Sequence, residues 1–457
     1  MTTAGDPGLR TQGTRNANAL DVLARAASAP ARAALIRISG SINEIAPHAL
    51  RVSGLSNFAQ LGDTVYTDNL FGEPLGEVVR VESVDLVVKP YSNQTRANIA
   101  TRVWLSGPFE IRASLAWRGR VIDALARPID GAGAIEVGER SFSVLRAPPP
   151  AMQREKPSEP LATGVRVIDL FTPLCVGQRI GIFAGSGVGK STLLGMLAKA
   201  GRFDTIVVSM VGERSREVRE FLDNSLGSNQ SRCVTVAATG DESPMLRRLA
   251  PLTAMTLAEY FRDLGHTVLL VVDSVTRYAH ACREIAMASG EPPVARGYTP
   301  SVFTELPRLL ERAGPGLQGS GSITGLFTVL VDGDDHNDPV ADAIRGILDG
   351  HIVLDRTIAD AGRLPAVDPL KSLSRLADRV LTAEQAKLVK LLRALIARFE
   401  ETRELRVLGG YQPGLDAEID KAVQMVPRIY DFIGQRPSEL PCVDVFRELL
   451  AILNPAA

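Results

Sequence analysis

The chain contains few cysteines and no long apolar segment. These two absences argue against a disulfide-rich protein and against a membrane-spanning one. Its four cysteines in 457 residues are scattered, and none forms a C-x-x-C pair. This spacing excludes a disulfide framework and a zinc site of paired cysteines, so we expect reduced thiols in a cytoplasmic protein. No apolar run approaches the roughly 20 residues needed to span a bilayer, and residues 1–22 lack the apolar centre of a secretory signal.

An excess of positive charge is also missing. The formal net charge is −1, which disfavours a large nucleic-acid-binding surface. The chain is 45% hydrophobic and 23% charged, as an ordinary soluble protein is. Because 457 residues exceed the size of a single hydrophobic core, we expect two or three domains.

Polar and alternating patterns fill the first hundred residues. Residues 1–30 are small and polar, and we expect a flexible leader there. Leu20, Leu23 and Ala27 recur at helical spacing, so this leader is either frayed or forms a short helix that docks a partner. Residues 31–103 contain short alternating runs such as GEVVRVESVDLVV, separated by Gly, Asn and Ser, which predict a small N-terminal β-barrel or sandwich.

Residues 104–375 alternate apolar strands with helical stretches. The runs RIGIFAG, TIVVSMVG, TVLLVVDS and TGLFTVLVDG are almost entirely apolar, as are strands of a parallel sheet buried on both faces. Residues 376–457 are expected to be helical. In this last part, apolar residues recur every three or four positions, at Ile419, Val423, Val426, Ile429 and Ile433.

Residues 184–191, AGSGVGKS, follow one of these strands and precede a helical stretch. The three glycines allow backbone N–H groups to turn toward an anion at a helix N-terminus. Lys190 is expected to reach the β and γ phosphates of a nucleotide, and the Ser191 hydroxyl to complete a magnesium shell. Ala184 stands where the usual motif has glycine, so we interpret the segment as a variant of the phosphate-binding loop.

Two acidic residues supply the other parts of a hydrolytic site. Asp273 follows five consecutive apolar residues and is a candidate for holding magnesium through its waters. Glu213 lies just beyond the strand TIVVSMV, where a doubly wound sheet gathers its ligands, and is a candidate base for the attacking water. Two plainer interpretations stay open at this point: a solvated, charged helix start at GERSREVRE, and nucleotide binding without turnover.

Several longer motifs carry a specific resemblance. They are AGSGVGKS, VGERSREVREF, VVDSVTRYAHACREIAMASGEPPVARGYTPSVFTELPRLLERAG, GDDHNDPVADAIRGILDGHIVLDR and LPAVDPLKSLSR. Together they resemble, over nearly the whole chain, the catalytic core shared by the rotary ATP synthase β subunit and the type III protein-export ATPases. The run GEPPVARGYTPSVFTELPRLLERAG is most similar to the export branch, and RVSGLSNFAQLGD to its flagellum-specific members.

This resemblance implies a fold, an assembly and cofactors. The implied fold is an α/β P-loop NTPase core with a mostly parallel sheet, preceded by a small N-terminal β-barrel and followed by an α-helical C-terminal domain. The implied assembly is a homohexameric ring that binds ATP and Mg²⁺ at its subunit interfaces.

The resemblance also assigns roles to individual residues. Glu213 corresponds to the glutamate that activates water, and Arg214 to the arginine beside it near the γ phosphate. Glu217 corresponds to an acid in the magnesium water shell. The expected catalytic residues are Glu213, Lys190, Arg375, Arg214 and Arg277, and the expected metal-binding residues are Ser191, Asp273 and Glu217. The expected nucleotide-binding residues are Ala184, Gly185, Ser186, Gly187, Val188, Gly189, Lys190, Ser191, Thr192, Tyr298, Leu364 and Tyr411.

Further assignments concern the γ phosphate and the base. Arg277 and Tyr298 correspond to residues on the γ-phosphate side. Arg375, from SLSR, corresponds to the arginine finger that enters the neighbouring subunit's site and stabilises charge on the transferring phosphoryl group. Leu364 stands where many members have a tyrosine that packs on adenine, so stacking is lost there, and Tyr411 is expected to compensate.

Four functions fit these residues. The first is ATP hydrolysis that energises protein export through the flagellar type III apparatus, and the second is the same activity in a virulence or symbiosis injectisome. The third, a proton-linked rotary ATP synthase subunit, is disfavoured because Glu213, Lys190 and Arg375 occur in one chain. The fourth, an RNA-translocating hexamer, is disfavoured by the near-neutral charge.

For the first function the resemblance implies particular partners and a location. The partners are other copies of the chain, regulator and stalk proteins of the export apparatus, and complexes of export chaperones with their substrates, but no nucleic acid. The location is cytoplasmic, peripherally associated with the inner-membrane flagellar base and its export gate.

The acidic loop around His336 has two possible interpretations, a metal site or a polar loop. His336 lies among Asp334, Asp335 and Asp338, but a polar loop facing the ring pore fits the resemblance better. The remaining histidines form no ligand-like cluster; they are His48, His266, His280 and His351.

Overall fold

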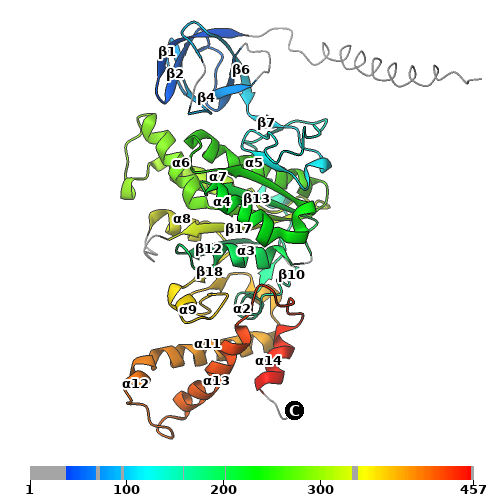
Figure 1. The fold of residues 1–457 in the computed structure, drawn as a ribbon, viewed down its shortest axis with the longest axis vertical. Coiled ribbons are helices and arrows are strands. Elements are labelled where there is room, and N and C mark those ends of the chain that lie inside the picture. Colours follow the sequence, from blue (N-terminus) through cyan, green and yellow to red (C-terminus); the bar gives the residue numbers. More distant parts are fainter. Residues whose placement is uncertain are drawn as a thin grey trace, which may run out of the picture.

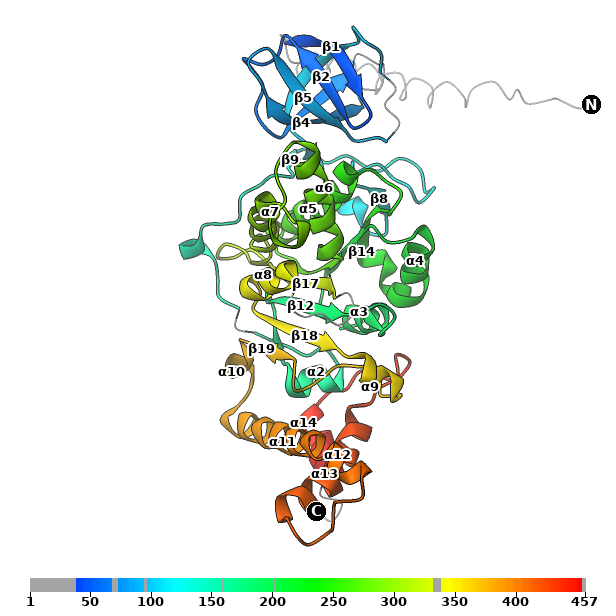
Figure 2. The ribbon, with the colours of Figure 1, turned by 90° about the vertical axis from the view of Figure 1, so that its left-hand side faces the viewer.

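The computed structural model describes residues 38–67, 73–93, 97–157, 159–200, 202–331 and 338–453. The leader expected at residues 1–30 and the loop around His336 both lie outside these ranges. A β-barrel, a sheet flanked by helices, and a group of helices are stacked along the long axis of the molecule (Figures 1 and 2). The predicted fold class, an α/β nucleotide-binding core between a small barrel and a helical domain, is therefore confirmed.

Six antiparallel strands close into the barrel in the order β1-β2-β5-β4-β3-β6. Inward-facing side chains such as Leu50, Val52 and Val88 are 0% exposed and fill its core. The expected boundary at residue 103 falls inside β6. The strands are β1 (Ser39–Ala46), β2 (Ala49–Ser53), β3 (Asp63–Thr67), β4 (Pro74–Val81), β5 (Asp85–Pro90) and β6 (Arg102–Pro108).

The central sheet has nine strands in the order β19-β18-β12-β17-β15-β13-β14-β8, with β16 paired to β17. The strands β8, β12, β13, β14, β15, β17 and β18 are parallel, whereas β16 and β19 are antiparallel to their neighbours. The strands are β8 (Val121–Asp123), β12 (Arg179–Ala184), β13 (Thr205–Val211), β14 (Cys233–Ala238), β15 (Thr267–Asp273), β16 (Gly314–Pro315), β17 (Ser322–Leu330), β18 (Gly350–Leu354) and β19 (Leu373–Ser374).

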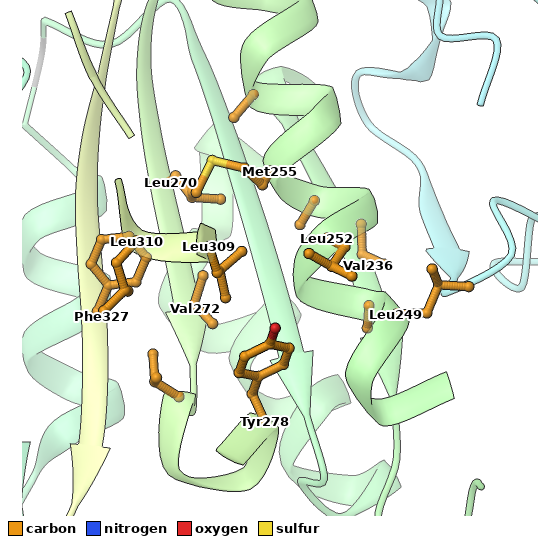
Figure 3. Packing of buried hydrophobic residues seen from close by; sticks show 14 of the residues in the cluster. Val236, Leu249, Leu252, Met255, Leu270, Val272, Tyr278, Leu309, Leu310 and Phe327 are labelled. Carbon is orange, nitrogen blue, oxygen red and sulfur yellow. The ribbon is translucent and has the colours of Figure 1, made fainter. Parts of the chain in front are cut away.

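Side-chain alternation along these strands divides the core between the two faces of the sheet. Leu270 and Val272 of β15 belong to the cluster under α5, α6 and α7, whereas Leu269 and Val271 belong to the cluster under α3. Figure 3 shows the first cluster, with Met255 of α5 beside Leu270. The helices are α2 (Arg166–Phe171), α3 (Lys190–Ala198), α4 (Ser215–Glu220), α5 (Pro244–Asp263), α6 (Val275–Ala288), α7 (Pro300–Leu310), α8 (Pro339–Ile347) and α9 (Arg356–Asp360).

The C-terminal part is helical, and its main helices pack on the same core cluster as α3. Of the predicted apolar stripe, Val426, Ile429 and Ile433 are buried, whereas Ile419 and Val423 are half-buried. The helices are α10 (Ala377–Val380), α11 (Ala383–Glu401), α12 (Arg403–Val407), α13 (Ala417–Ile433) and α14 (Val445–Leu453).

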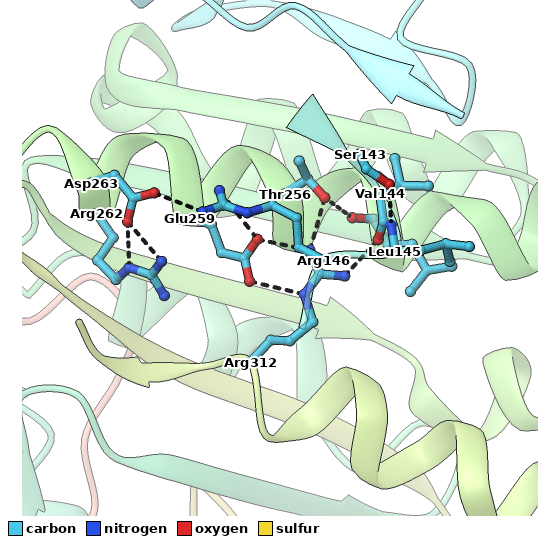
Figure 4. Close-up of polar contacts among 10 residues, drawn as sticks. Ser143, Val144, Leu145, Arg146, Thr256, Glu259, Arg262, Asp263 and Arg312 are labelled. Atoms are coloured by element: carbon cyan, nitrogen blue, oxygen red, sulfur yellow. Dashed lines mark hydrogen bonds and ion pairs between the residues drawn. The ribbon is translucent and has the colours of Figure 1, made fainter. Parts of the chain in front are cut away.

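A buried ion pair joins α5 to the chain that follows α7 (Figure 4). Both side chains of Arg312 and Glu259 are 2% exposed. Arg312 donates to the two carboxylate oxygens of Glu259 at 2.9 and 2.8 Å, and to the carbonyl of Val144 at 2.7 Å. The pair therefore fixes the segment leading out of the barrel against the helical face of the central sheet.

In the part of the chain that the structure describes, no helix is long and apolar enough to cross a membrane. The four cysteines all lie in this part, and each is buried and without a disulfide partner.

Candidate active site

The phosphate-binding loop connects β12 to α3, as predicted. Gly187 and Gly189 have φ of +77° and +95°, and a Cβ atom at either position would meet nothing within 4 Å. The glycines are thus required by backbone conformation rather than by space. The N-cap residue of α3, Gly189, has no side chain to cap the first turn, so the N–H groups of this turn are left for an anion.

The two ends of this loop differ in burial. Ala184 ends β12 and is 1% exposed; it is not among the residues with positive φ, which explains why alanine is tolerated where the usual motif has glycine. Val188 is buried, and Gly185 is too, whereas Ser186 and the first α3 hydroxyls, Ser191 and Thr192, are exposed.

Lys190, the first residue of α3, lies between two carboxylates. Its Nζ contacts Oδ1 of Asp273 and lies 3.5 Å from Oε1 of Glu213. Burial by itself would lower the pKa of Lys190, but these two carboxylates outweigh it and raise the pKa. The lysine is therefore charged and stands next to the open loop.

The topology of the sheet explains why these residues meet. β12, β13 and β15 are parallel, and Met210 of β13 is paired with Asp273 of β15. The carboxyl ends of these strands therefore lie at one edge of the sheet, where ligands of doubly wound folds bind. Asp273 is 1% and Glu213 9% exposed, so these two carboxyls are largely removed from water.

Burial sets the electrostatics of the two glutamates. It raises the pKa of Glu213 to about 7, although the charge of Lys190 acts in the opposite direction. A hydrogen bond with Glu213 holds the pKa of Glu217 below its ordinary value. Two neighbouring carboxyls whose pKa values move apart are typical of acid–base sites, and a pKa near 7 suits a base.

The donor set fits magnesium. The hydroxyl of Ser191 and the carboxylates of Asp273 and Glu217 are the hard oxygen ligands that this ion prefers. Among the described residues, no group of three or more His, Cys, Asp or Glu could hold a metal by itself. Mg²⁺ keeps several waters and shares its coordination with substrate phosphates, so a few hard oxygen ligands from the protein are enough for it.

Two of the predicted arginines are exposed beside this cluster. Arg214 immediately follows Glu213 and precedes α4. Arg277 lies in the first turn of α6, and its aliphatic stem packs on Gly212, where a Cβ atom would come within 3.3 Å of it. Both guanidinium groups can approach a phosphate from the solvent side.

Arg375 lies at the opposite edge of the sheet from the loop. Its N–H donates to the carbonyl of Asp349 at 2.9 Å, whereas Ala184 is paired with Leu354, five residues further along. At about 3.3 Å per residue, roughly 16 Å of strand separates the two positions. The exposed side chain of Arg375 therefore cannot reach the phosphate loop of its own chain.

The three residues expected near the γ phosphate and the base are not brought together. Tyr298 is 4% exposed, stacks on His280 and shares a 3.0 Å hydrogen bond with it. Leu364 is 47% exposed and lines a cavity of about 1110 Å³ between residues 355–371 and the C-terminal helices. The hydroxyl of Tyr411 donates to Asp420 at 2.6 Å, and Tyr411 does not line this cavity.

Comparisons with known proteins show which family the chain belongs to. Residues 164–374 match the ATP synthase alpha/beta family, nucleotide-binding domain, and residues 381–451 match the T3SS EscN ATPase C-terminal domain. The flagellum-specific ATP synthase of Rhizobium meliloti is 57% identical over 418 residues, which cover 92% of this chain and 90% of the relative. The chain belongs to the flagellum-specific ATP synthase family.

Secretion ATPases are also similar to this chain. The SPI-2 type 3 secretion system ATPase of Salmonella typhimurium is 44% identical over 371 residues, 81% of this chain and 85% of the relative. The assembled ATPase EscN from the type III secretion system of enteropathogenic E. coli superimposes with a TM-score of 0.83 at 39% identity, covering 92% of this chain and all of the EscN chain in that structure. EscN in complex with its central stalk EscO gives a TM-score of 0.81.

Membership of this family makes the chain an ATP-hydrolysing enzyme and supports the flagellar branch over the injectisome. Two residues near the site were not predicted from the sequence. Thr328 of β17 donates to Oδ1 of Asp273 at 2.7 Å, and Arg356 of α9 donates to the carbonyl of Ser186 in the phosphate loop at 2.8 Å. The hydroxyl inside the apolar run LFTVLV was the available signal for Thr328, because a buried hydroxyl needs a partner.

Proposed function

We propose that this family member hydrolyses magnesium-bound ATP with Glu213 as the base for the attacking water. The convergence of Lys190, Glu213 and Asp273 beside an uncapped phosphate loop carries this proposal. Lys190 binds the β and γ phosphates, and Arg214 and Arg277 approach the γ phosphate from solvent.

Mg²⁺, when bound, neutralises developing charge on the phosphates. Ser191, Asp273 and Glu217 are the residues that would hold it. The remaining work of this chain is positioning: the loop N–H groups orient the phosphates, and the buried Glu213 accepts a proton from water at its carboxylate.

We propose that the base and ribose extend from the loop into the cavity lined by Leu364. Arg356 touches the phosphate loop, and its neighbours Asp355 and Thr357 line the cavity, so the two spaces are adjacent. Leu364 offers an apolar surface without ring stacking. Tyr298 and Tyr411 would have to move, or act from a neighbouring copy, to contact the nucleotide.

We further propose that the active form is a homohexameric ring in which Arg375 completes the site of the adjacent copy. The separation of roughly 16 Å between Arg375 and its own phosphate loop supports this arrangement. The similar protein EscN is an assembled ATPase in one solved structure and is bound to its central stalk in another. By analogy, the ring would engage a stalk protein, a regulator and chaperone–substrate complexes at the cytoplasmic side of the flagellar export gate.

The proposal is tested with Glu213→Gln. The purified variant should bind ATP at least as tightly as the wild type but release phosphate at least 100-fold more slowly, because the amide cannot accept a proton at neutral pH, and a positioned base contributes on the order of 10²–10⁴ in rate. The matched control is Glu220→Gln, a solvent-exposed glutamate of α4 paired with Arg216. Wild-type turnover in Glu213→Gln would remove the assigned base.

The cellular role needs a separate experiment. In a flagellated bacterium that lacks its own flagellum-specific ATP synthase, the wild-type gene should restore export of hook and filament proteins, and Glu213→Gln should not. If the wild-type gene instead restores only effector secretion in an injectisome mutant, the flagellar assignment is wrong.

A further inference from the structure

The carboxylate of Asp273 is held from two sides within the protein. Lys190 contacts Oδ1 from the phosphate loop, and the hydroxyl of Thr328 lies 2.7 Å from the same oxygen. Within the described ranges, no side chain or N–H group donates to the other oxygen, Oδ2. The protein thus uses one oxygen of this carboxylate and leaves the other open.

Thr328 comes from the strand next to Asp273. β17 pairs with β15, Val272 opposite Phe327, so the following residues, Asp273 and Thr328, lie side by side at the carboxyl edge. Thr328 is 0% exposed, and its hydroxyl also lies 3.4 Å from the carbonyl of Val272. The single hydroxyl proton goes to the carboxylate, which is the nearer and charged acceptor.

The two groups that contact Oδ1 of Asp273 are expected to behave differently when nucleotide binds. Lys190 is also the residue that binds the nucleotide phosphates, so its contact with Asp273 is available to be exchanged. Thr328 has no such second task and is fixed in the centre of the sheet. When Lys190 turns to the phosphates, the hydroxyl of Thr328 is the remaining side-chain donor on Asp273 among the described residues.

We propose that Thr328 is a positioning residue that fixes the rotation of the Asp273 carboxylate and so presents Oδ2 toward the magnesium shell. This inference rests on the proposed function, since it takes Asp273 as the acid of that shell. A threonine that served only to fill the sheet would affect stability but not the dependence of nucleotide binding on magnesium.

The experiment measures the affinity for ADP by calorimetry, with Mg²⁺ and with EDTA, so that no turnover is needed. Thr328→Val removes the hydroxyl at nearly constant volume. The variant should bind metal-free ADP within twofold of the wild type but lose roughly tenfold of the gain in affinity that Mg²⁺ brings, the typical effect of one hydrogen bond to a charged group. Thr328→Ser should restore that gain.

The matched control is Thr324→Val, which removes another fully buried hydroxyl from β17. That hydroxyl accepts from the N–H of Gly177 at 2.9 Å, so the control perturbs folding but not Asp273. It should lower the melting temperature without changing the effect of Mg²⁺. If Thr328→Val does not fold, Thr328→Ala compared with Thr328→Ser gives the same test.

Two results would overturn the inference, and only one of them would also overturn the proposed metal site. If Thr328→Val keeps the full magnesium effect while Asp273→Asn loses it, Thr328 has no positioning role and the proposed metal site stands. If Mg²⁺ does not change the affinity of the wild type for ADP, both the inference and the proposed metal site fail.

Discussion

Replacing Arg375 by alanine should stop turnover without disturbing the nucleotide site of the chain that carries the substitution. The backbone of Arg375 lies roughly 16 Å along the sheet from the phosphate loop of its own chain, too far for an arginine side chain to span. Its own contact is a 3.1 Å hydrogen bond from Nη2 to the carbonyl of Arg345, at an exposed position. Nucleotide affinity and the melting temperature should therefore change little.

The loss of turnover should be large. An arginine that stabilises the transferring phosphoryl group contributes on the order of 10³–10⁵ in rate in other nucleotide hydrolases. We expect at least a 10³-fold fall in phosphate release for Arg375→Ala at saturating ATP. Arg379→Ala is the control, because Arg379 is also exposed and lies only four residues further along, and it should retain near-wild-type turnover.

Mixed rings decide where Arg375 acts. Lys190→Ala subunits cannot hold the phosphates but keep Arg375, so they can complete the site of an Arg375→Ala neighbour. In randomly assembled rings of equal proportions, about a quarter of the interfaces combine an intact Lys190 with an intact Arg375 from the next copy. Phosphate release should recover to about that fraction of the wild-type rate, with assembly followed by mass photometry. Mixed rings that stay as inactive as the two parents would show that Arg375 does not work across the interface.

Two further predictions concern the buried charges. Burial raises the pKa of Glu213 from its ordinary 4.5 to about 7, so the folded chain keeps a proton that the unfolded chain releases. The stability of the nucleotide-free protein should therefore fall as pH rises from 4.5 to 7. Glu213→Gln should remove this part of the slope in urea unfolding, and identical slopes would contradict the assigned burial. Glu259→Gln should destabilise the protein by about 3–5 kcal/mol, because it leaves the buried charge of Arg312 without its carboxylate. Glu220→Gln, at an exposed pair, should cost less than about 0.5 kcal/mol, and equal losses in the two variants would refute the argument.

Local sequence determined the parts of the site that lie next to each other along the chain. The phosphate loop needs glycines where φ is positive and a helix that follows it directly, and the segment AGSGVGKS meets the first condition and begins the second. Asp273 and Glu213 could be predicted at one edge because Asp273 ends an apolar strand and Glu213 lies just beyond another, and parallel strands end together. The N-terminal barrel could likewise be predicted from short alternating apolar and polar runs, and the helical C-terminal part from apolar residues at spacings of three and four.

Other features of the site depend on packing between segments that are distant in sequence, and only the tertiary structure decided them. The pKa of Glu213 is raised because the folded core removes its carboxyl from water, a property that no neighbour in sequence confers. The register of β18 with β19 places Arg375 at the edge of the sheet opposite the phosphate loop. The pairing of β15 with β17 places the hydroxyl of Thr328 against Asp273. Helix packing buries Tyr298 against His280. Sequence specifies which groups stand at the ends of strands because that is a local property of the chain. Which groups then touch is set by the order and register of the strands, because these arise only when the whole sheet is assembled.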